Sequence, residues 1–208
     1  MHIIFYIFFL ANLAVADKNV EPNIQYIQVG VKERAASTAE ELLISEARLV
    51  AKLLKKKLGN ALKKSIQTSG VPASIKACSE LAPEIAIDLS KQFNAKVTRV
   101  SLKHRNPLIG APDSWEQLAL TEFDNNKAIL SSNTILEKSE IVNEPRGFYF
   151  RYMQTLVVKP VCLSCHGKKT DITTAVESKI KKNYPADIAK NYDLGDIRGA
   201  ISIKKLIQ

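Results

Sequence analysis

The stretch Val161-Cys162-Leu163-Ser164-Cys165-His166-Gly167 holds two cysteines separated by two residues and followed directly by a histidine. This Cys-x-x-Cys-His spacing is the attachment pattern of c-type haem. The two thiols can add to the two vinyl groups of the porphyrin, and the adjacent histidine can reach the iron as an axial ligand. We therefore predict one covalently attached haem c, held by Cys162 and Cys165, with His166 on the iron.

A zinc site and a redox-active cysteine pair are the alternatives for these residues. Zinc needs four ligands, and outside the motif the only cysteine and histidines are Cys78, His104 and His2. A thioredoxin-like pair lies at a strand-to-helix junction near the start of a domain, whereas this motif lies late in the chain. Both observations favour haem attachment.

The first sixteen residues read MHIIFYIFFLANLAVA and contain no Lys, Arg, Asp or Glu. An apolar run that ends in Ala-Val-Ala indicates a secretory signal peptide, which we expect to be cleaved after Ala16. The start lacks the usual Lys or Arg, so an uncleaved anchor is the alternative, but the run is shorter than the ~20 apolar residues of a membrane helix. Export predicts a periplasmic protein and suits the motif, because bacteria attach c-type haem outside the cytoplasm.

The chain has 208 residues and a formal charge of +9, and its mature part has the size of one domain. The basic residues lie mostly in stretches that we predict to be helical, such as residues 55–57. This pattern is typical of a solvated helix face, and together with export it argues against nucleic-acid binding. The positive charge can still attract an anionic membrane surface or an acidic protein.

Residues 17–36 are polar and show no period, which predicts a linker before a single domain over residues 37–208. Ser37 and Glu40 form a capping-box pattern that predicts the start of a long helix ending near Thr68. Its apolar stripe, at spacings of three and four, predicts packing against a core. The stripe consists of Leu43, Ala47, Val50, Leu54, Leu58 and Ala61.

Gly70 and Pro72 predict the end of this helix, and a second helix is expected from Pro72 to about Phe93, with a break or kink at Pro83. Further along, alternating apolar residues predict strands over 95–102, 133–142, 147–158 and 197–203. Short helices are expected after Asp113 and over residues 177–183. The order of elements predicts an α+β fold, in which an antiparallel sheet has its flanking helices on one side.

Several motifs resemble, in the same order, those of one known family. They are residues 77–86, 99–103, 105–107, 112–113, 115–116, 149–158, 184–187 and 195–202. The chain is similar over residues 37–205 to the bacterial c-type haem proteins with a PAS-like domain, formerly a domain of unknown function. Members occur alone or as sensor segments of histidine kinases and chemoreceptors. The resemblance implies a PAS-like sheet domain with one haem.

Cys78 is left over when the motif takes two of the three cysteines. From the residues alone, an intermolecular disulfide, a special thiol and a buried inert cysteine all remain open. The resemblance implies that Cys78 is the second axial ligand, opposite His166. A thiolate ligand favours Fe(III) and lowers the reduction potential. Met153 and His104 are the other candidate ligands, although core filling is the expected role of Met153.

Arg99, Lys103 and Arg105 are candidate partners for the haem propionates, since carboxylates need cationic or amide donors. Tyr152 and Met153 complete the predicted haem environment, although packing in the core is the default role of both. Residues 108–111 lengthen the loop after Pro107 beyond the usual family pattern, so we expect the conformation of this loop to differ.

These observations predict an exported monohaem c-type cytochrome that senses redox state or a diatomic gas through His/Cys ligation. The alternative is a periplasmic electron-transfer cytochrome c. No distal acid–base pair of the kind that peroxidase chemistry needs is recognisable, so we do not expect an enzyme. A sensor of this length needs a separate redox or signalling partner, and the long basic helix is the predicted contact. A second copy of the chain is a further predicted partner.

Overall fold

The computed structural model describes residues 25–28, 38–129 and 134–207. The predicted signal peptide, most of the predicted linker and Ser37 lie outside this range. In chain order the main elements are β1 Gln25–Gln28, α1 Thr38–Phe93, β2 Lys96–Val100, α2 Pro107–Gly110, α3 Ser114–Asn125, β3 Thr134–Glu144, β4 Gly147–Val157, α4 Pro160–His166, α5 Thr174–Asn183 and β5 Ile197–Leu206.

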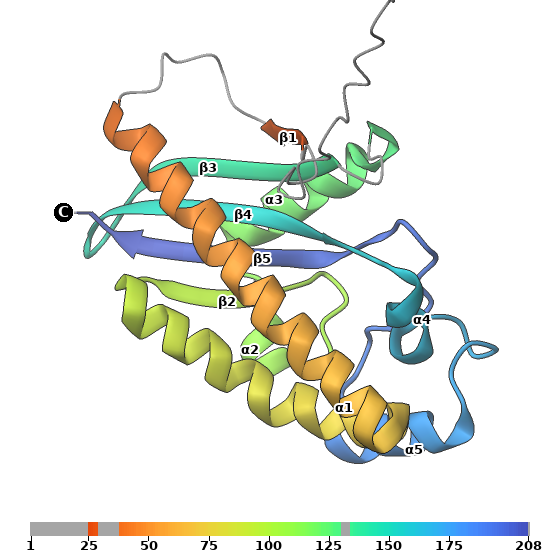
Figure 1. Cartoon of the computed structure of the whole chain (residues 1–208). Helices are drawn as coiled ribbons and strands as arrows, with labels where there is room; N and C mark the ends of the chain where they lie inside the picture. Colours follow the sequence, from red (N-terminus) through yellow and green to blue (C-terminus); the bar gives the residue numbers. More distant parts are fainter. Residues whose placement is uncertain (1–24, 29–37, 130–133, 208) are drawn as a thin grey trace, which may run out of the picture.

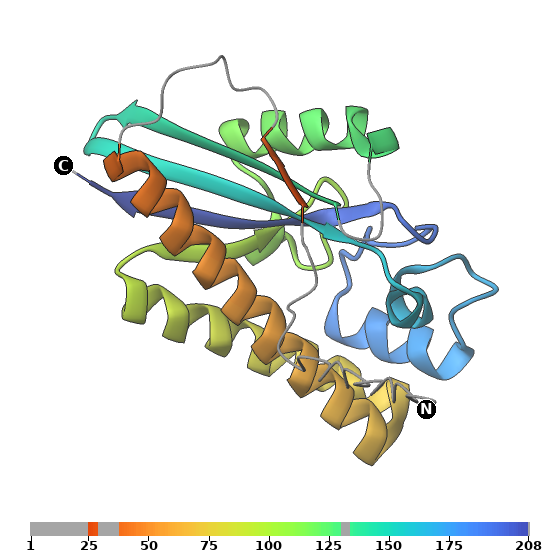
Figure 2. The same cartoon turned by 45° about the horizontal axis from the view of Figure 1, so that its top comes forward.

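Helix α1 is a hairpin of two helical halves that meet at Gly70. This glycine has a φ of 76° and a ψ of 171°, which is not a helical conformation and which a residue without a Cβ adopts at little cost. Figures 1 and 2 show the two halves diverging from this reversal in a V. The predicted stop at Gly70 is confirmed. A break or a kink was predicted at Pro83; the break is wrong, because the described helix continues through Pro83 to Phe93.

The five strands form one mixed sheet in the order β1-β3-β4-β5-β2. The three pairs β3–β4, β4–β5 and β5–β2 are antiparallel, as expected. The pair β1–β3 is parallel. The sheet is therefore not purely antiparallel, and residues 25–28 of the predicted linker form an edge strand instead. The α+β class, the long first helix and the flanking helices are confirmed.

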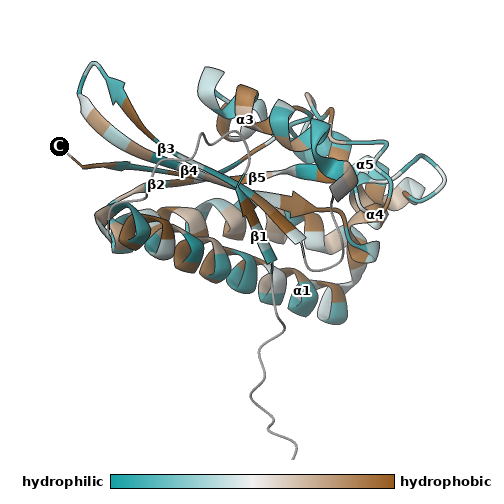
Figure 3. Ribbon diagram, turned by 90° about the horizontal axis from the view of Figure 1, so that it is seen from above, coloured by the Kyte–Doolittle hydropathy of each residue, from teal (hydrophilic) through white to brown (hydrophobic). Residues whose placement is uncertain are grey.

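Helices cover both faces of this sheet, as Figure 3 shows, with α1 on one side and α3 on the other. The prediction that the helices lie on one side is therefore wrong, because β4 has apolar side chains on both of its faces. Side chains alternate between the two faces of a strand, and β4 supplies both cores. Phe150 and Tyr152 pack with Leu54 and Leu89 of α1. Met153 packs on the opposite face with Phe123 of α3. The apolar stripe predicted for the first helix thus faces the sheet.

Helix α5 and the haem-motif helix α4 lie at one end of the sheet. Ile75, in the second half of α1, packs with Val176 and Ile180 of α5. Figure 1 shows α4 beyond the ends of β4 and β5, near the reversal of α1. Within the described ranges, no helix is both long enough and apolar enough to cross a bilayer.

Candidate functional site

The Cys-x-x-Cys-His motif forms the short helix α4, which begins at Pro160 just after β4. Proline suits the first helical position because its fixed φ is already helical. Cys162 and Cys165 are three residues apart, so they lie on neighbouring parts of one helix face. Both are half-buried, and no disulfide joins any of the three cysteines, all of which are described. The two thiols of the motif are therefore available as a pair.

Gly167 ends α4 where the chain has no room for a side chain. Its amide donates to the carbonyl of Leu163 at 2.9 Å. A Cβ at this position would lie 2.5 Å from Oδ2 of Asp171 and 2.7 Å from that carbonyl oxygen. The glycine after the motif is thus required for the close turn that follows His166.

His166 is fixed by the segment that precedes β5. Its Nδ1 lies 2.9 Å from the carbonyl oxygen of Ala189, and its own carbonyl accepts the amide of Tyr192 at 3.1 Å. Burial holds the pKa of His166 well below its usual value, and the charges of Arg198 and Arg105 lower it further. The imidazole is therefore neutral at pH 7. When Nδ1–H donates to Ala189, Nε2 keeps a free lone pair that can bind a metal.

Arg198 lies against the ring of His166. Its Nε is 3.2 Å from Nδ1 and 3.5 Å from Nε2. Because Nδ1 is protonated and donates to the carbonyl oxygen of Ala189, it cannot accept a hydrogen bond. We therefore assign the hydrogen bond from Arg198 to Nε2, at 3.5 Å. Its Nη1 also donates to Ser101 at 2.9 Å. A metal at Nε2 requires the Arg198 side chain to turn away from the ring.

Arg105 connects α4 to the segment that holds His166. It forms an ion pair with Asp187 at 3.1 Å, and both side chains are largely buried. It also donates to the carbonyl oxygens of Cys165 at 2.5 Å and Ala189 at 3.3 Å. Asp187 in turn accepts the Ala189 amide at 2.9 Å. This network fixes the two backbone groups on either side of the imidazole.

Cys78 lies on the second half of α1 and approaches the same cluster. Burial raises the pKa of its thiol, while the nearby charges of Arg99 and Arg105 act in the opposite direction. Burial also raises the pKa of Cys165, and Cys78 is close enough to contribute to that rise. Arg99 and Arg105 also act on His166. Cys78, Cys165 and His166 therefore share Arg105 as a neighbour, and Arg99 acts on Cys78 and His166, although Cys78 is far from the motif in sequence.

The remaining predicted residues lie at different distances from this cluster. Lys103 reaches the carbonyl oxygen of Lys190 at 3.4 Å and lies 4.6 Å from the ring centroid of Tyr192, so it borders the cluster. Tyr152 is fully buried under α1 and donates to Glu137 at 2.6 Å. Met153 is fully buried on the α3 face of the sheet.

Within the described ranges, no set of three Cys, His, Asp or Glu side chains is arranged to hold a metal ion directly. The cluster provides two kinds of single ligand instead, the imidazole of His166 and the thiol of Cys78. Two such ligands suit a metal whose remaining bonds come from a macrocycle.

Comparison with known proteins identifies the family of this chain. The sequence matches the model of the Tll0287-like family, named Tll0287, over residues 25–205. The chain belongs to the Tll0287-like family. Among solved structures, the chain is similar to the crystal structure of the cyanobacterial heme-protein Tll0287, with a TM-score of 0.58 and 22% sequence identity over 83% of this chain and 98% of that chain. No curated protein matches the sequence. These matches confirm the predicted family resemblance and the fold.

Three residues of this Tll0287-like chain hold the cluster together without having been predicted. Arg198, Asp187 and Ala189 all contact His166 or Arg105. Arg198 carries one signal, because it is a charged residue among the small and apolar residues of the first half of β5. Asp187 and Ala189 lie in an irregular segment, where no periodicity points to their role.

Proposed function

We propose that the protein binds one haem covalently through Cys162 and Cys165, with His166 and Cys78 as axial ligands, and senses redox state or a diatomic gas. The observation that carries this proposal is the convergence of Cys78 with the Cys-x-x-Cys-His helix on Arg99 and Arg105. The solved relative is itself described as a heme-protein, which supports the same cofactor here.

The residues present suit this cofactor. Nε2 of the neutral His166 becomes available once Arg198, 3.5 Å away, turns from the ring, and no disulfide joins Cys162 and Cys165. Arg99 and Arg198 have no carboxylate partner within the described ranges; burial lowers the pKa of the half-buried Arg198, whereas Arg99 is exposed. Two cations in such surroundings favour a ligand that carries carboxylates, as haem does. Arg105 is already paired with Asp187, so its predicted propionate contact would be shared with that pair.

Bound haem would supply one-electron redox chemistry and a coordination site for a small ligand. The chain contributes a thiol whose protonation can change. Burial raises the pKa of Cys78, so its sulfur retains a proton when it is not a ligand, whereas Arg99 and Arg105 favour the thiolate. These opposing effects make Cys78 a ligand that can be released by protonation, and such release is the basis of the proposed sensor.

The second candidate is a periplasmic electron carrier. Val161, within α4, is 52% exposed, so the motif lies at the protein surface, where electrons could pass directly to a partner. For either role we propose export to the periplasm, no enzymatic activity, and a separate protein partner. We propose that the partner protein contacts the basic face of the first half of α1. Association with an anionic membrane or with a second copy of the chain is also part of the proposal.

Carbon monoxide distinguishes the two roles. The protein would be produced in cells that mature cytochromes c, and its absorption spectrum recorded oxidised, reduced, and reduced with carbon monoxide. A sensor should change ligation on reduction and form a carbon monoxide adduct. Retention of both ligands without an adduct would exclude the sensor and favour the carrier.

Covalent attachment needs its own readout. Haem should remain with the polypeptide on a denaturing gel, and it should be lost from the Cys162→Ser/Cys165→Ser variant. Haem that leaves the wild-type chain on denaturation would contradict covalent attachment.

A further inference from the structure

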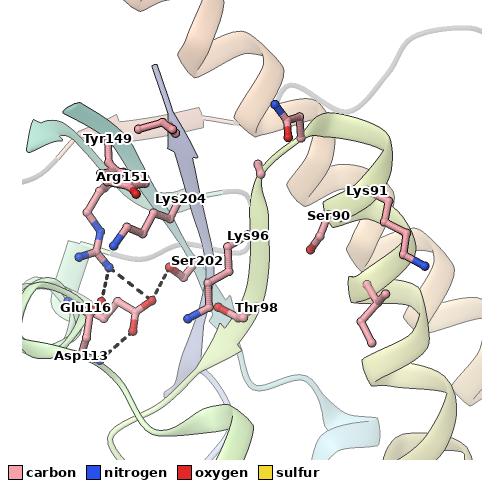
Figure 4. Close-up of a pocket in the computed structure, with 14 residues that line it drawn as sticks. Ser90, Lys91, Lys96, Thr98, Asp113, Glu116, Tyr149, Arg151, Ser202 and Lys204 are labelled. Carbon is pink, nitrogen blue, oxygen red and sulfur yellow. Dashed lines mark hydrogen bonds and ion pairs between the residues drawn. The ribbon is translucent and has the colours of Figure 1, made fainter. Parts of the chain in front are cut away.

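An open groove of about 540 Å³ lies on the α3 side of the sheet, apart from the cluster around Cys78. It extends from the end of α1 across β2, β5 and β4 to the start of α3 (Figure 4). Lys96 and Thr98 of β2 line it. Arg99, the next residue, influences Cys78 instead, because successive side chains of a strand point to opposite faces. A volume of this size is typical of sites for small molecules.

The wall of the groove near α3 carries both acidic and basic side chains, and they pair with one another or with Glu144. Arg151 contacts Asp113 at 2.5 Å and Glu116 at 3.7 Å, and Ser202 donates to Glu116 at 2.6 Å. Lys204 forms an ion pair with Glu144. Figure 4 shows this paired group at the α3 end of the groove. It therefore offers little net charge to a ligand.

Lys96 and Thr98 are different, because neither side chain has a hydrogen-bond or ion-pair partner among the residues that the structure describes. Both line the same groove, and Figure 4 shows them on the groove side of β2. An ammonium and a hydroxyl on one strand face can together bind one carboxylate. Among the described residues Lys91, at the end of α1, also lines the groove without a partner, but only Lys96 shares its strand face with an unpaired hydroxyl.

Apolar side chains border the same groove. Ile87 is 52% exposed and Leu206 is 51% exposed, and Tyr149 also lines the groove. These side chains expose apolar surface that a ligand can cover. The groove therefore combines the unpaired lysines Lys91 and Lys96, as far as the described residues go, with an apolar border.

We propose that this groove binds a small organic carboxylate. The carboxylate contacts Lys96 and Thr98, and the apolar body of the ligand packs against Ile87, Tyr149 and Leu206. Because β2 and β5 also carry Arg99 and Arg198, the same two strands connect this groove to the cluster at His166. The proposal does not depend on haem, since none of the groove residues belongs to that cluster.

Titration calorimetry of the purified full-length protein at low ionic strength tests this proposal. Benzoate is the probe, and benzamide and benzylamine are matched compounds without the negative charge. We expect benzoate to bind with a Kd of about 1 mM, typical for a ligand of this size, and benzamide to bind about tenfold more weakly. Lys96→Gln should weaken benzoate binding about tenfold, because one charge-assisted hydrogen bond is lost. Lys181→Gln, on exposed α5, should have no effect.

Three results would overturn the proposal. Benzoate could bind no more tightly than benzamide, benzylamine could bind more tightly than benzoate, or Lys96→Gln could leave benzoate binding unchanged. Loss of benzoate binding in Arg99→Gln with no loss in Lys96→Gln would assign the anion to the arginine cluster instead. Lys96 is exposed, so its variant should fold, and a circular dichroism spectrum like that of wild type checks this.

Discussion

Replacement of Arg105 by methionine removes the side chain that links α4 to the segment holding His166. The Arg105 side chain is 13% exposed and that of Asp187 is 3% exposed. In Arg105→Met the carboxylate of Asp187 keeps the amide of Ala189 as a donor but loses its counter-charge. The carbonyl oxygen of Cys165 loses a charged donor as well.

The magnitude follows from this burial. Removing one partner of a buried ion pair costs about 3–5 kcal/mol, and the slight exposure of Arg105 places the expected loss at the lower end, about 3 kcal/mol. For a chain of this size each kcal/mol lowers the melting temperature by about 2–4 °C, so a fall of roughly 6–12 °C is expected. The exposed pair of Lys76 and Glu80, 3.9 Å apart with side chains 75% and 59% exposed, provides the control. Lys76→Met should cost less than about 0.5 kcal/mol.

Urea unfolding of four proteins measures the coupling directly: wild type, Arg105→Met, Asp187→Asn and the double variant. Because the two side chains interact, the double variant should lose less stability than the sum of the single losses, by at least about 1.5 kcal/mol. Additive losses, or a loss below about 1 kcal/mol in Arg105→Met, would refute the account of Arg105 as the link between α4 and His166.

Three further outcomes are expected. Gly199→Ala should destabilise the sheet severely, by about 3 kcal/mol or more, since a Cβ at this φ of 149° would lie 2.3 Å from the carbonyl oxygen of Val100. Urea unfolding measures this loss of stability. A variant with near wild-type stability would contradict the close approach of β2 and β5. Asp113 should titrate below its usual range, because burial, which raises its pKa, is outweighed by the Glu116 amide and the charge of Arg151. The ionised Asp113 then contributes to stability above the unfolded pKa of about 3.9, and this contribution disappears as pH falls through the lower pKa of the folded protein. Asp113→Asn should therefore be less stable than wild type at pH 7 and equal to it near pH 2. A stability deficit that grows on acidification would be inconsistent with this sign. The mass of the exported protein should match cleavage after Ala16, and a mass that includes residues 1–16 would indicate the uncleaved anchor.

Much of the fold was predictable because its signals are local. The apolar stripe that includes Leu54 packs on the sheet as expected, and Gly70 reverses the chain. The continuous helix through Pro83 was not predictable from local preference, which disfavours proline inside a helix. Ile85 and Leu89 pack on the core just after it, and this burial offsets the lost backbone hydrogen bond. Strand β1 was missed because four residues with polar ends carry no period, and its partner β3 lies more than a hundred residues away.

The candidate site likewise has features that the sequence predicts and features that it does not. The spacing of Cys162, Cys165 and His166 is a local signal, and it predicts a common site by itself. The approach of Cys78 depends on the return path of α1, which the residues alone could not predict, and only the family resemblance implied it. The contacts of Arg198 and Asp187 join segments separated by 32 and 82 positions. Such contacts arise from tertiary packing, so no pattern in the neighbouring sequence predicts which residues will meet.

The account depends above all on Cys78 and His166 binding the same haem iron. Electron paramagnetic resonance of the oxidised holo-protein tests this directly in wild type, Cys78→Ala and Met153→Leu. The wild type should show a low-spin signal typical of thiolate ligation. Cys78→Ala should lose that signal, because its iron becomes high-spin or takes a different ligand. Met153→Leu should give the same signal as wild type. An unchanged low-spin signal in Cys78→Ala, together with its loss in Met153→Leu, would contradict the site described and assign the second ligand to Met153.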